Sequence, residues 1–381
     1  MLPLTRGSLS IRKFSRICRG CAFSTSNKTK PKVSLLDLHN SGLSAIERLC
    51  LEEALLRHDP LQRSWAILGM HDPTYNTYLR VHDSKGRGDE NSSRNENCII
   101  IMGIGGKPDK LLNVEKVKQD NVLTIKRFSG GGTVVIDHSS LWTTFIGRKE
   151  HFPHVDPYPR SIMEWSAEHV FDPVFRRMKE DVLNHHSLKQ PRRNLAAVQT
   201  PRNFTPGVSL NRRSLVMDNK SCGLAQGSGD TVAYTSTSAS ARNSKDVPDF
   251  SLRENDYVLG ERKMGGNAQS ITGTSWIHHT SFLWDFDDEN MKYLTLPQKR
   301  PDYRGDRQHE DFLVKLKSVY GGIGMDDASS RRSFLNNVRN VAIDAFEVEE
   351  ATLRDALDVV DELGGMQAWF DGKCRTRILD L

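Results

Sequence analysis

Three consecutive glycines, Gly130 to Gly132, stand between two segments rich in β-branched and apolar residues. Glycine loses more backbone freedom on folding than any other residue, so a triplet is costly unless the backbone must pass close to another group. Successive N–H groups with no Cβ in the way can face an anion or a carbonyl oxygen. We expect the flanking segments, Leu123–Arg127 and Thr133–Ile136, to be strands. The triplet therefore predicts either a ligand-contacting loop or a glycine-rich hairpin turn.

The surroundings of the triplet match no standard nucleotide motif. A P-loop requires GxxxxGK[ST], and the nearby segment Gly103–Pro108 lacks both that spacing and the hydroxyl residue. The same segment lacks the third glycine of GxGxxG. Arg127, just before the triplet, is placed where its guanidinium could offer a fork of donors to a phosphate.

A second candidate stretch contains one lysine in a glycine-rich setting. Two short strands are expected at Tyr257–Leu259 and Arg262–Met264, and Lys263 lies in the second of them, just before Gly265 and Gly266. An ammonium at such a place suits a point-charge donor to a carboxylate or phosphoryl oxygen. Asp256 is a candidate partner for Mg²⁺ or for an ammonium group. The alternative interpretation is an ordinary exposed hairpin with a solvated lysine.

The third stretch has two adjacent histidines, His278 and His279, before an apolar run. Neighbouring side chains on a strand point to opposite faces, so we expect one of the two to be buried. The HEXXH spacing of a metal-binding helix is absent, and so is a second cysteine pair to join Cys18 and Cys21. No structural metal site is predicted.

Taken in this order, the three stretches resemble the lipoate–protein ligase family, within the wider biotin/lipoate ligase fold. That family shows R-R-x-S-G-G-G-[TA]-V-x-H-D, then a strand with G-[DR]-[RK]-K-x-[SAG]-G-[NS]-A-[QY], then H-H-[GT]-[TS]-L. The resemblance covers roughly residues 41–182 and 252–345. It implies an α+β catalytic domain related to class II synthetases, with a mixed, largely antiparallel sheet flanked by helices.

The resemblance also implies an activity, its co-substrates and its partners. Lipoate or octanoate would react with ATP and Mg²⁺ to give acyl-AMP, and the acyl group would pass to a lysine of a lipoyl-domain carrier protein. The carriers would be E2 subunits of 2-oxoacid dehydrogenases and the glycine cleavage H protein, with a small accessory chain as a further partner. Lys263 would be catalytic, and Asn255 and Asp256 would lie near the nucleotide and Mg²⁺. The acyl substrate would contact Arg127, Ser129, Gly130, Gly131, Gly132, Thr133, Gly266, Asn267, Ala268 and His279.

Two other functions remain open. Relatives of this fold include acyltransferases that use a carrier-bound acyl group through a cysteine thioester. Cys222 is the nearest candidate thiol, while Val247–Leu259 contains no cysteine. A non-catalytic relative that binds acyl groups or carriers is the third hypothesis, because Ile136 stands where many members have histidine. The biotin ligase glycine-arginine loop is absent.

The charge of the chain is concentrated near its start. The net charge is +5, yet residues 1–36 contain eight basic residues and no acid precedes Asp37. The rest of the chain has fewer basic than acidic residues, which argues against a nucleic-acid-binding surface. A basic, serine-rich, acid-free leader is typical of a transit peptide, so we expect residues 1–36 to direct import into mitochondria, with plastids as an alternative. No apolar run is long enough to span a membrane.

We expect residues 41–381 to form a single catalytic domain with two additions. One is a polar loop at 83–97, and the other is a disordered insertion at about 187–245 that is rich in Ser, Asn and Arg. Too little chain follows Leu363 for a separate C-terminal accessory domain. The scattered cysteines are expected to be reduced thiols.

The apolar pattern predicts helices and strands along this domain. Ser41 is expected to cap the first helix, and Pro173 to kink or divide the third. The expected helices are Leu43–Arg57, Asn113–Gln119, Ser161–Asp181, Phe312–Leu316, Ser333–Ala345 and Ala351–Leu363, and the further strands are Trp65–Gly69, Cys98–Met102, Leu141–Ile146 and Ser281–Asp285.

Overall fold

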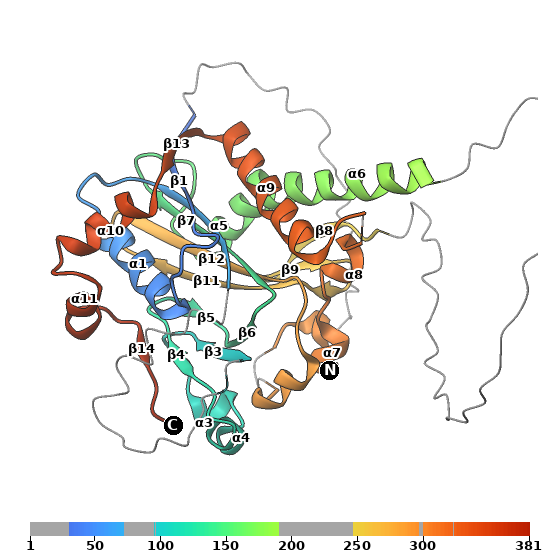
Figure 1. The fold of residues 1–381 in the computed structure, drawn as a ribbon, viewed down its shortest axis with the longest axis horizontal. Helices are drawn as coiled ribbons and strands as arrows, with labels where there is room; N and C mark the ends of the chain where they lie inside the picture. The colour runs from blue at the N-terminus through green and yellow to red at the C-terminus, as the bar shows by residue number, and fades with distance from the viewer. Residues whose placement is uncertain (1–29, 72–94, 96, 190–246, 297–299, 323) are drawn as a thin grey trace, which may run out of the picture.

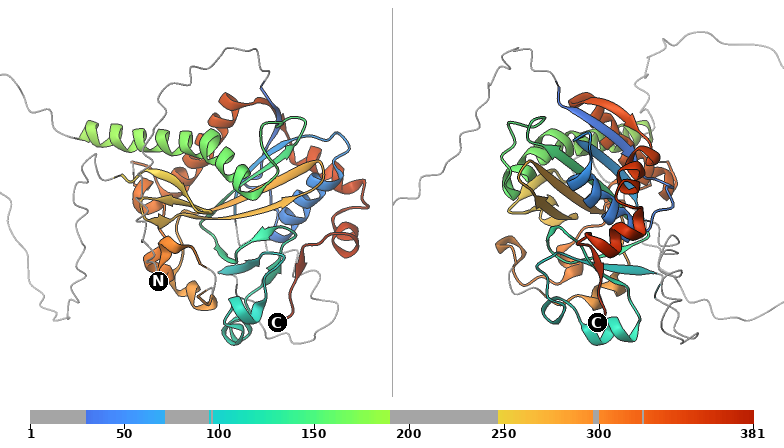
Figure 2. Two further views of the ribbon diagram at one scale, coloured as in Figure 1. Left: turned by 180° about the vertical axis from the view of Figure 1, so that it is seen from behind. Right: turned by 90° about the vertical axis from the view of Figure 1, so that its left-hand side faces the viewer.

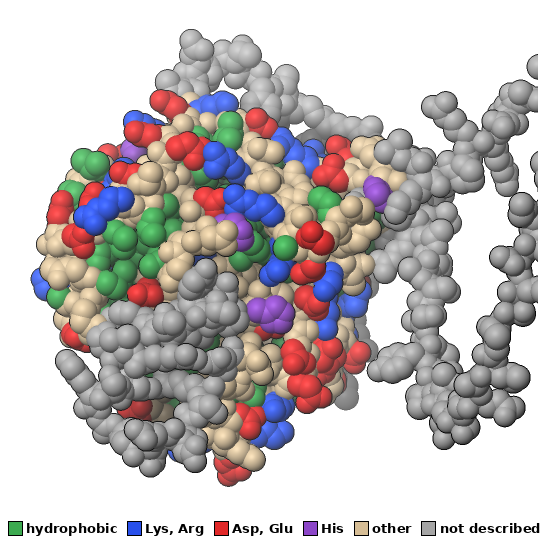
Figure 3. All heavy atoms as spheres, viewed as in Figure 1, with side chains coloured by type: hydrophobic (Ala, Val, Ile, Leu, Met, Phe, Trp, Pro, Cys, Tyr) green, Lys and Arg blue, Asp and Glu red, His purple; other side chains and the backbone are tan. Residues whose placement is uncertain are grey.

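The fold was analysed in a computed structural model of the chain (Figure 1). It describes residues 30–71, 95, 97–189, 247–296, 300–322 and 324–381. Within these ranges no helix combines the length and apolar character needed to cross a bilayer. On the face shown in Figure 3, acidic and basic side chains are interspersed.

A seven-stranded sheet forms the centre of the molecule. Its first two pairings, β13 with β1 and β1 with β2, are parallel, and all the others are antiparallel. The expected mixed, largely antiparallel sheet is therefore confirmed. In spatial order the strands are β13 (Glu347–Ala351), β1 (Lys32–Asp37), β2 (Trp65–Met70), β7 (Ser140–Arg148), β12 (Ser275–Leu283), β11 (Gly265–Ile271) and β5 (Gly130–Gly131).

Two smaller sheets flank the large one. The four-stranded sheet has the order β14 (Arg377–Ile378), β4 (Thr124–Lys126), β3 (Cys98–Met102) and β6 (Val134–Asp137). The three-stranded sheet has the order β10 (Arg262–Lys263), β9 (Asp256–Leu259) and β8 (Phe250–Arg253). Between β4 and β6 the chain leaves the four-stranded sheet and pairs Gly130 and Gly131 with β11 at the edge of the large sheet. The glycine triplet therefore joins two sheets and is not a hairpin turn.

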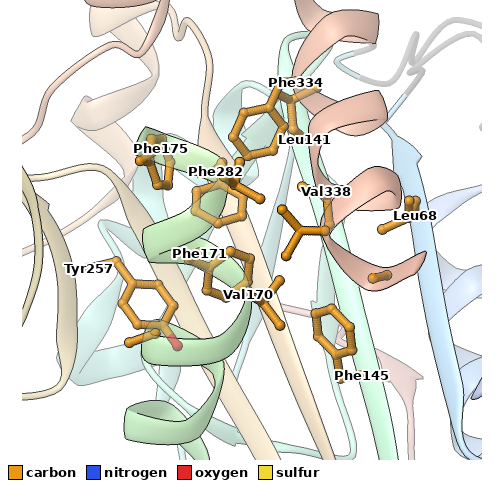
Figure 4. Close-up of a cluster of buried hydrophobic side chains, with 14 of the residues drawn as sticks. Leu68, Leu141, Phe145, Val170, Phe171, Phe175, Tyr257, Phe282, Phe334 and Val338 are labelled. Atoms are coloured by element: carbon orange, nitrogen blue, oxygen red, sulfur yellow. The ribbon is translucent and has the colours of Figure 1, made fainter. Parts of the chain in front are cut away.

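Helices cover both faces of the large sheet. On one face α5 (Pro159–Ser166), η2 (Ala167–Phe171), α6 (Asp172–Lys189) and α9 (Asp327–Ala345) enclose an aromatic core, and Figure 2 shows α6 lying across the strands. Figure 4 shows Phe175, Phe282 and Phe334 meeting there. The other face is covered by α1 (Ala45–His58), α10 (Leu353–Asp361) and α11 (Met366–Gly372). The remaining helices are α3 (Pro108–Leu111), α4 (Val114–Gln119), η3 (Asp288–Tyr293), η4 (Asp302–Arg304), α7 (His309–Phe312) and α8 (Lys317–Tyr320).

The structure corrects the expected boundary of the leader. Residues Lys32–Leu36 lie in β1, between β2 and β13, and Val33 and Leu35 are buried in the core. The predicted basic leader overlaps with this strand because Val33 and Leu35, two apolar residues in alternation, directly follow Lys30 and Lys32. The domain therefore begins before residue 41, and the part of the predicted leader that remains, residues 1–29, lies outside the described residues.

Several helix boundaries also differ from expectation. Ser44, not Ser41, caps α1, in a capping box with Glu47. The segment expected as one helix from Ser161 continues to Lys189, with a π-helical turn, η2, directly before Pro173. A widened turn accommodates the proline ring and its missing N–H without ending the helix.

The helix expected at Phe312–Leu316 is wrong. Helix α7 ends at Phe312, and Leu313 then bridges in parallel to Lys263. The extended backbone continues, with Val314 N–H donating to the Lys263 carbonyl. The loop expected at 83–97 and the insertion expected at 187–245 lie almost wholly outside the described residues, apart from 95, 97 and the end of α6.

Candidate functional site

A narrow cavity, which we call the apolar pocket, lies between helix α1 and strands β6, β7, β11 and β12. Its volume is about 50 Å³. At about 10–15 Å³ for each enclosed water, this is room for a few water molecules. Aliphatic and aromatic groups form most of the wall, which consists of Leu49, Ile101, Arg127, Val134, Ile136, Trp142, Thr143, Thr144, Gly266, Asn267, Ala268, His279, Thr280 and Ser281.

A buried charge cluster lies behind the part of the apolar pocket wall formed by Thr144 and His279. Glu52, on α1, is fully buried and accepts hydrogen bonds from Arg48 Nε and Thr144 Oγ1, both at 2.9 Å. His279 Nδ1 lies 3.1 Å from Glu52 Oε2. Burial by itself disfavours the charged carboxylate, but the positive charge of Arg48 and the hydrogen bond from His279 outweigh it and lower the pKa of Glu52 to about 2. The cluster therefore fixes the His279 ring at the pocket wall.

Arg127 organises the glycine triplet. Its Nη2 donates to the carbonyls of Gly132 and Gly130, at 2.8 and 3.2 Å, and its Nη1 donates to that of Ile101 at 3.3 Å. Burial lowers the pKa of the Arg127 guanidinium to about 10. Only Nε has no partner. The side chain therefore lines the pocket, but the phosphate fork expected of it is occupied by backbone carbonyls.

Glycine is required at one position of the triplet. Gly131 has φ +116°, and a Cβ added there would lie 2.5 Å from the Asn267 carbonyl oxygen and 2.8 Å from Arg127 Nη2. Gly132, in contrast, has open space where a Cβ would stand. The triplet therefore allows close backbone contact with β11 and leaves Gly132 facing the neighbouring cavity.

That second cavity, which we call the polar cleft, is much larger, at about 620 Å³. It meets the apolar pocket at Val134 and Gly266, which line both. The other lining residues include Gly105, Gly106, Leu111, Gly131, Gly132, Thr133, Asp256, Lys263, Leu283, Met291, Leu294, Arg304, His309 and Phe312. A long ligand could therefore place an apolar tail in one cavity and a polar head in the other.

Lys263 lies at the polar cleft in an ion pair. Its Nζ is 2.6 Å from Asp256 Oδ1, and about a quarter of its side chain (26%) is exposed. The second carboxylate oxygen of Asp256 accepts a hydrogen bond from Tyr303 Oη at 2.9 Å. Burial and the negative charge of Asp256 raise the pKa of Tyr303, so its hydroxyl stays protonated as a donor. Asp256 therefore orients the ammonium group from behind.

The structure brings most of the predicted site residues together. Gly266, Asn267, Ala268 and His279 line the apolar pocket, as Arg127 does, and Gly131, Gly132, Thr133, Asp256 and Lys263 line the polar cleft. His278 is fully buried on the opposite face of β12, as expected of one of the two histidines.

Three predicted residues line neither cavity. Ser129 is fully buried beside the triplet, and its hydroxyl has no partner. Gly130 pairs with Gln269 in the sheet. Asn255 occupies the turn between β8 and β9, where its carbonyl accepts from Asn267 Nδ2 at 3.4 Å.

Sequence reasoning missed two groups of lining residues. Leu49 and Trp142 line the apolar pocket, and Arg48 and Glu52 lie behind its wall, where Glu52 contacts Thr144 and His279. The adjacent acids of α1 in an apolar helix were the available signal. Arg304 and His309 form part of the outer wall of the polar cleft. Their signal was the run of basic residues between Arg300 and His309, in a stretch without apolar periodicity.

A protein-built metal site is not evident in the described part of the chain. No three His, Cys, Asp or Glu side chains gather there to hold an ion. Both carboxylate oxygens of Asp256 already have partners, so its geometry favours holding Lys263 over holding a metal.

Fold and site define an α+β domain with two joined cavities, a glycine triplet at their border and one lysine in the larger cavity. The model of the lipoyl protein ligase A/B catalytic domain matches residues 92–238 and 202–332. The chain belongs to this family.

Three related proteins illustrate the range of the similarity. "Inactive lipoate–protein ligase 2" of Plasmodium falciparum is 26% identical over 293 residues, which are 73% of this chain and 62% of that protein. The chain thus spans less than two thirds of that relative. A bipartite lipoate protein ligase from Thermoplasma acidophilum, studied with its E2 lipoyl domain, is 12% identical, with a TM-score of 0.47 and coverage of 88% of this chain and 91% of that one. P. falciparum LipL1, crystallised with lipoate, is 13% identical, with a TM-score of 0.46 and coverage of 88% and 70%.

Proposed function

We propose that the protein attaches lipoate or octanoate to a lysine of a lipoyl-domain carrier protein through an acyl-AMP intermediate. The observation that carries the proposal is that Val134 and Gly266 line both the apolar pocket and the polar cleft, so the two cavities adjoin, and that Lys263 lines the cleft. An acyl chain in the pocket would present its carboxylate to the lysine and to a nucleotide in the cleft.

In the first step the acyl carboxylate attacks the α-phosphorus of ATP, and pyrophosphate leaves. Negative charge grows on the phosphoryl oxygens, so fixed positive groups stabilise the transition state. Lys263 supplies such a charge, and Asp256 keeps its ammonium oriented. Mg²⁺ would enter on the nucleotide, since phosphates can hold it without a protein cage.

In the second step the amine of the carrier lysine attacks the acyl carbonyl, and AMP leaves. Charge now develops on the carbonyl oxygen, and Lys263 can donate to it. The incoming amine must be deprotonated to attack. Asp256 or a water molecule in the cleft can take that proton.

The narrowness of the apolar pocket sets a condition on binding. An eight-carbon chain is larger than the few waters that the pocket holds, so the lining side chains must move apart. Leu49 and Trp142 line the pocket, whereas the His279 ring is tied to Glu52. We therefore expect Leu49 and Trp142 to change conformation when the acyl chain binds, and the His279 ring to keep its position.

A transferase that takes its acyl group from a carrier-bound thioester is the second candidate. None of the residues that line either cavity is a cysteine, so an acyl-cysteine intermediate has no support among them. Cys222 lies outside the described residues. Direct transfer to the carrier lysine would still use Lys263 as the oxyanion donor, and this is the form of the alternative that the cleft supports.

The decisive experiment incubates the purified full-length protein with an apo lipoyl domain. One mixture contains Mg-ATP with free lipoate or octanoate, and the other contains octanoyl-carrier protein or octanoyl-coenzyme A without ATP. Intact-mass analysis reports acylation of the carrier. Acylation only in the first mixture supports the ligase, acylation only in the second supports the transferase, and acylation in neither supports a non-catalytic binding protein, in keeping with Ile136 in the pocket wall.

We further propose mitochondrial import, with E2 subunits and the glycine cleavage H protein as carriers. Because β1 begins at Lys32, the test is a deletion of residues 1–29, not of residues 1–36. The shorter deletion should abolish import and leave the melting temperature unchanged. Deletion through residue 36 removes a central strand and should prevent folding, which is the matched contrast.

A further inference from the structure

The outer wall of the polar cleft contains polar groups that no protein group satisfies. Arg304 Nη2, His309 Nε2 and Thr133 Oγ1 are all buried, and none has a hydrogen-bond partner. All three side chains line the polar cleft. Buried polar groups without partners cost free energy, so three around one cavity indicate a ligand that would satisfy them.

Arg304 is the strongest of these groups. It lies in η4, is only 5% exposed, and forms no ion pair with any described carboxylate. Its Nε donates to the Arg307 carbonyl at 3.2 Å, and its guanidinium lies 4.6 Å from the centre of the Phe312 ring. These contacts fix the side chain and leave Nη2 free. Asp256 is near enough to act on Arg304 electrostatically but forms no ion pair with it. A buried guanidinium without a direct carboxylate contact is suited to binding two oxygens of one anion, as a phosphate offers them.

His309 places a titratable imidazole in the same wall. Burial and then the charge of Arg304 lower the pKa of His309, with a smaller contribution from Lys263, and these effects outweigh the opposite influence of Glu310 and of a backbone hydrogen bond with Thr295. An anion between these groups would have the opposite effect, since it favours the charged imidazole. Binding of an anion should therefore take up a proton when the pH lies near the pKa of the histidine.

We propose that Arg304, together with His309 and with Thr133 across the polar cleft, binds a phosphate ester of the activated acyl donor. The inference rests on the proposed function and adds to it the residues that recognise the donor. It also moves the phosphate contact from Arg127, whose Nη1 and Nη2 hold backbone carbonyls, to the segment after β12. The phosphate can belong to a nucleotide or to the pantetheine part of coenzyme A or a carrier protein.

The test compares Arg304→Gln with Arg300→Gln in the full-length protein. Arg300 is exposed, pairs with Asp306 in the same segment, and does not line the cleft, so its variant matches the charge loss. Calorimetry measures the affinity for ATP, coenzyme A, pyrophosphate and free octanoate. A lost charged hydrogen bond costs about 10-fold or more in affinity. We expect that loss for at least one phosphate ligand in Arg304→Gln, with octanoate affinity within about twofold and Arg300→Gln unchanged.

The ligand that weakens identifies the donor. A loss for ATP alone indicates the nucleotide, and a loss for coenzyme A alone indicates the pantetheine phosphate. Equal weakening of octanoate and of the phosphate ligands would mean a structural role for Arg304 and would overturn the proposal. So would unchanged affinities, or a wild-type protein that binds none of the phosphate ligands.

Two further measurements keep the inference separate from the proposed function. Arg304→Lys keeps the charge without the planar fork and should restore part of the phosphate affinity, so it also serves if Arg304→Gln fails to fold. Carrier acylation is assayed in parallel. Wild-type acylation with unaltered phosphate affinity in both Arg304 variants overturns the inference and leaves the proposed function standing. If the protein acylates no carrier but its phosphate binding depends on Arg304, the inference stands and the proposed function is overturned.

Discussion

The apolar pocket and the polar cleft share two residues and differ in how their charged groups are held. In the pocket, Glu52 accepts from Arg48 and Thr144, and Arg127 donates to three backbone carbonyls. In the cleft, Arg304 has a buried nitrogen without a partner. Arg48 Nη2 and Arg127 Nε beside the pocket also have no partner, but the other polar atoms of these side chains are hydrogen bonded within the fold. The pocket's charged groups therefore mainly stabilise the fold, whereas the cleft contains the partly exposed Lys263 in its ion pair with Asp256. Substitutions in the two cavities should therefore be separable by what they damage, which is stability in one and transfer in the other.

Glu52→Gln should give the largest change in stability. The substitution keeps the shape but leaves the buried Arg48 without its counter-charge, so the free energy of unfolding should fall by about 3–5 kcal/mol. Urea denaturation measures it. The matched control is Glu164→Gln, which breaks an exposed pair with Arg160 and should cost about 0.5 kcal/mol or less. A loss below 1 kcal/mol for Glu52→Gln would contradict the role given to the cluster.

Lys263→Ala should show the opposite pattern. The loss of one oxyanion donor lowers a rate by about 10²–10³-fold, and carrier acylation should fall by at least that factor. Asp256 loses its counter-charge but keeps the hydrogen bond from Tyr303, and Lys263 is itself partly exposed, so the loss of stability should be clearly smaller than for Glu52→Gln. Lys263→Arg should recover little, because a planar fork does not replace a compact ammonium. Lys292→Ala, in an exposed pair with Asp120, is the control and should keep the wild-type rate. If Lys263→Ala is destabilised as strongly as Glu52→Gln, the division between the two cavities fails.

The border between the cavities offers a comparison of neighbouring glycines. Gly131→Ala forces a non-glycine residue to φ +116° and places its Cβ 2.5 Å from a backbone oxygen, so unfolding should become easier by about 1–3 kcal/mol. Gly132→Ala meets nothing within 4 Å and should change stability by less than about 0.5 kcal/mol. Thermal or urea melts compare the two. Equal losses would mean that the triplet is not held against β11 as described.

The last comparison concerns pH and the histidine that faces away from the pocket. Burial, and then the charge of His279, lower the pKa of His278 to about 3, from an ordinary 6.5. Below pH 6.5 the unfolded chain binds a proton that the folded protein refuses, so stability falls by about 1.4 kcal/mol per pH unit from this residue until the pH approaches 3.

His278→Gln removes that proton from the unfolded chain. Between pH 6 and 4 the free energy of unfolding of this variant should therefore fall less steeply than that of the wild type. The difference in slope should be about 1.4 kcal/mol per pH unit, the value for one proton, and urea denaturation at each pH measures it. His138→Gln removes an exposed histidine and should keep the wild-type slope. A slope in His278→Gln equal to that of the wild type would show that His278 is protonated in the folded state.

The apolar pocket could be predicted in good part from the sequence, because its residues lie in short motifs. The glycine triplet, Asn267 and His279 were each marked by their neighbours along the chain. The outer wall of the polar cleft could not be found in this way. Arg304 and His309 lie in two helices of three and four residues, η4 and α7, and elements this short show no period of 2 or 3.6 residues in the sequence.

The fold was predictable where one face of an element is regularly apolar. Strand β3 was expected at its observed bounds, and α1 within two residues at its start. Strand β1 was missed because the lysines before it suggested a leader, and its burial depends on two partners distant in sequence. The ion pair of Lys32 with Glu349 shows that a basic residue of the expected leader belongs to the folded sheet.

The pairing of β1 with β13 joins residues 32–36 to residues 347–351. One edge of β1 can therefore form its backbone hydrogen bonds only after nearly the whole chain has been made. During ribosomal synthesis, or during passage through a pore with the amino end first, β1 has one open edge until β13 emerges. Open strand edges are where chains associate wrongly, and distant pairings form slowly. A chain shortened before β13 should therefore keep an open edge on β1 and associate with other chains more readily than the full-length protein.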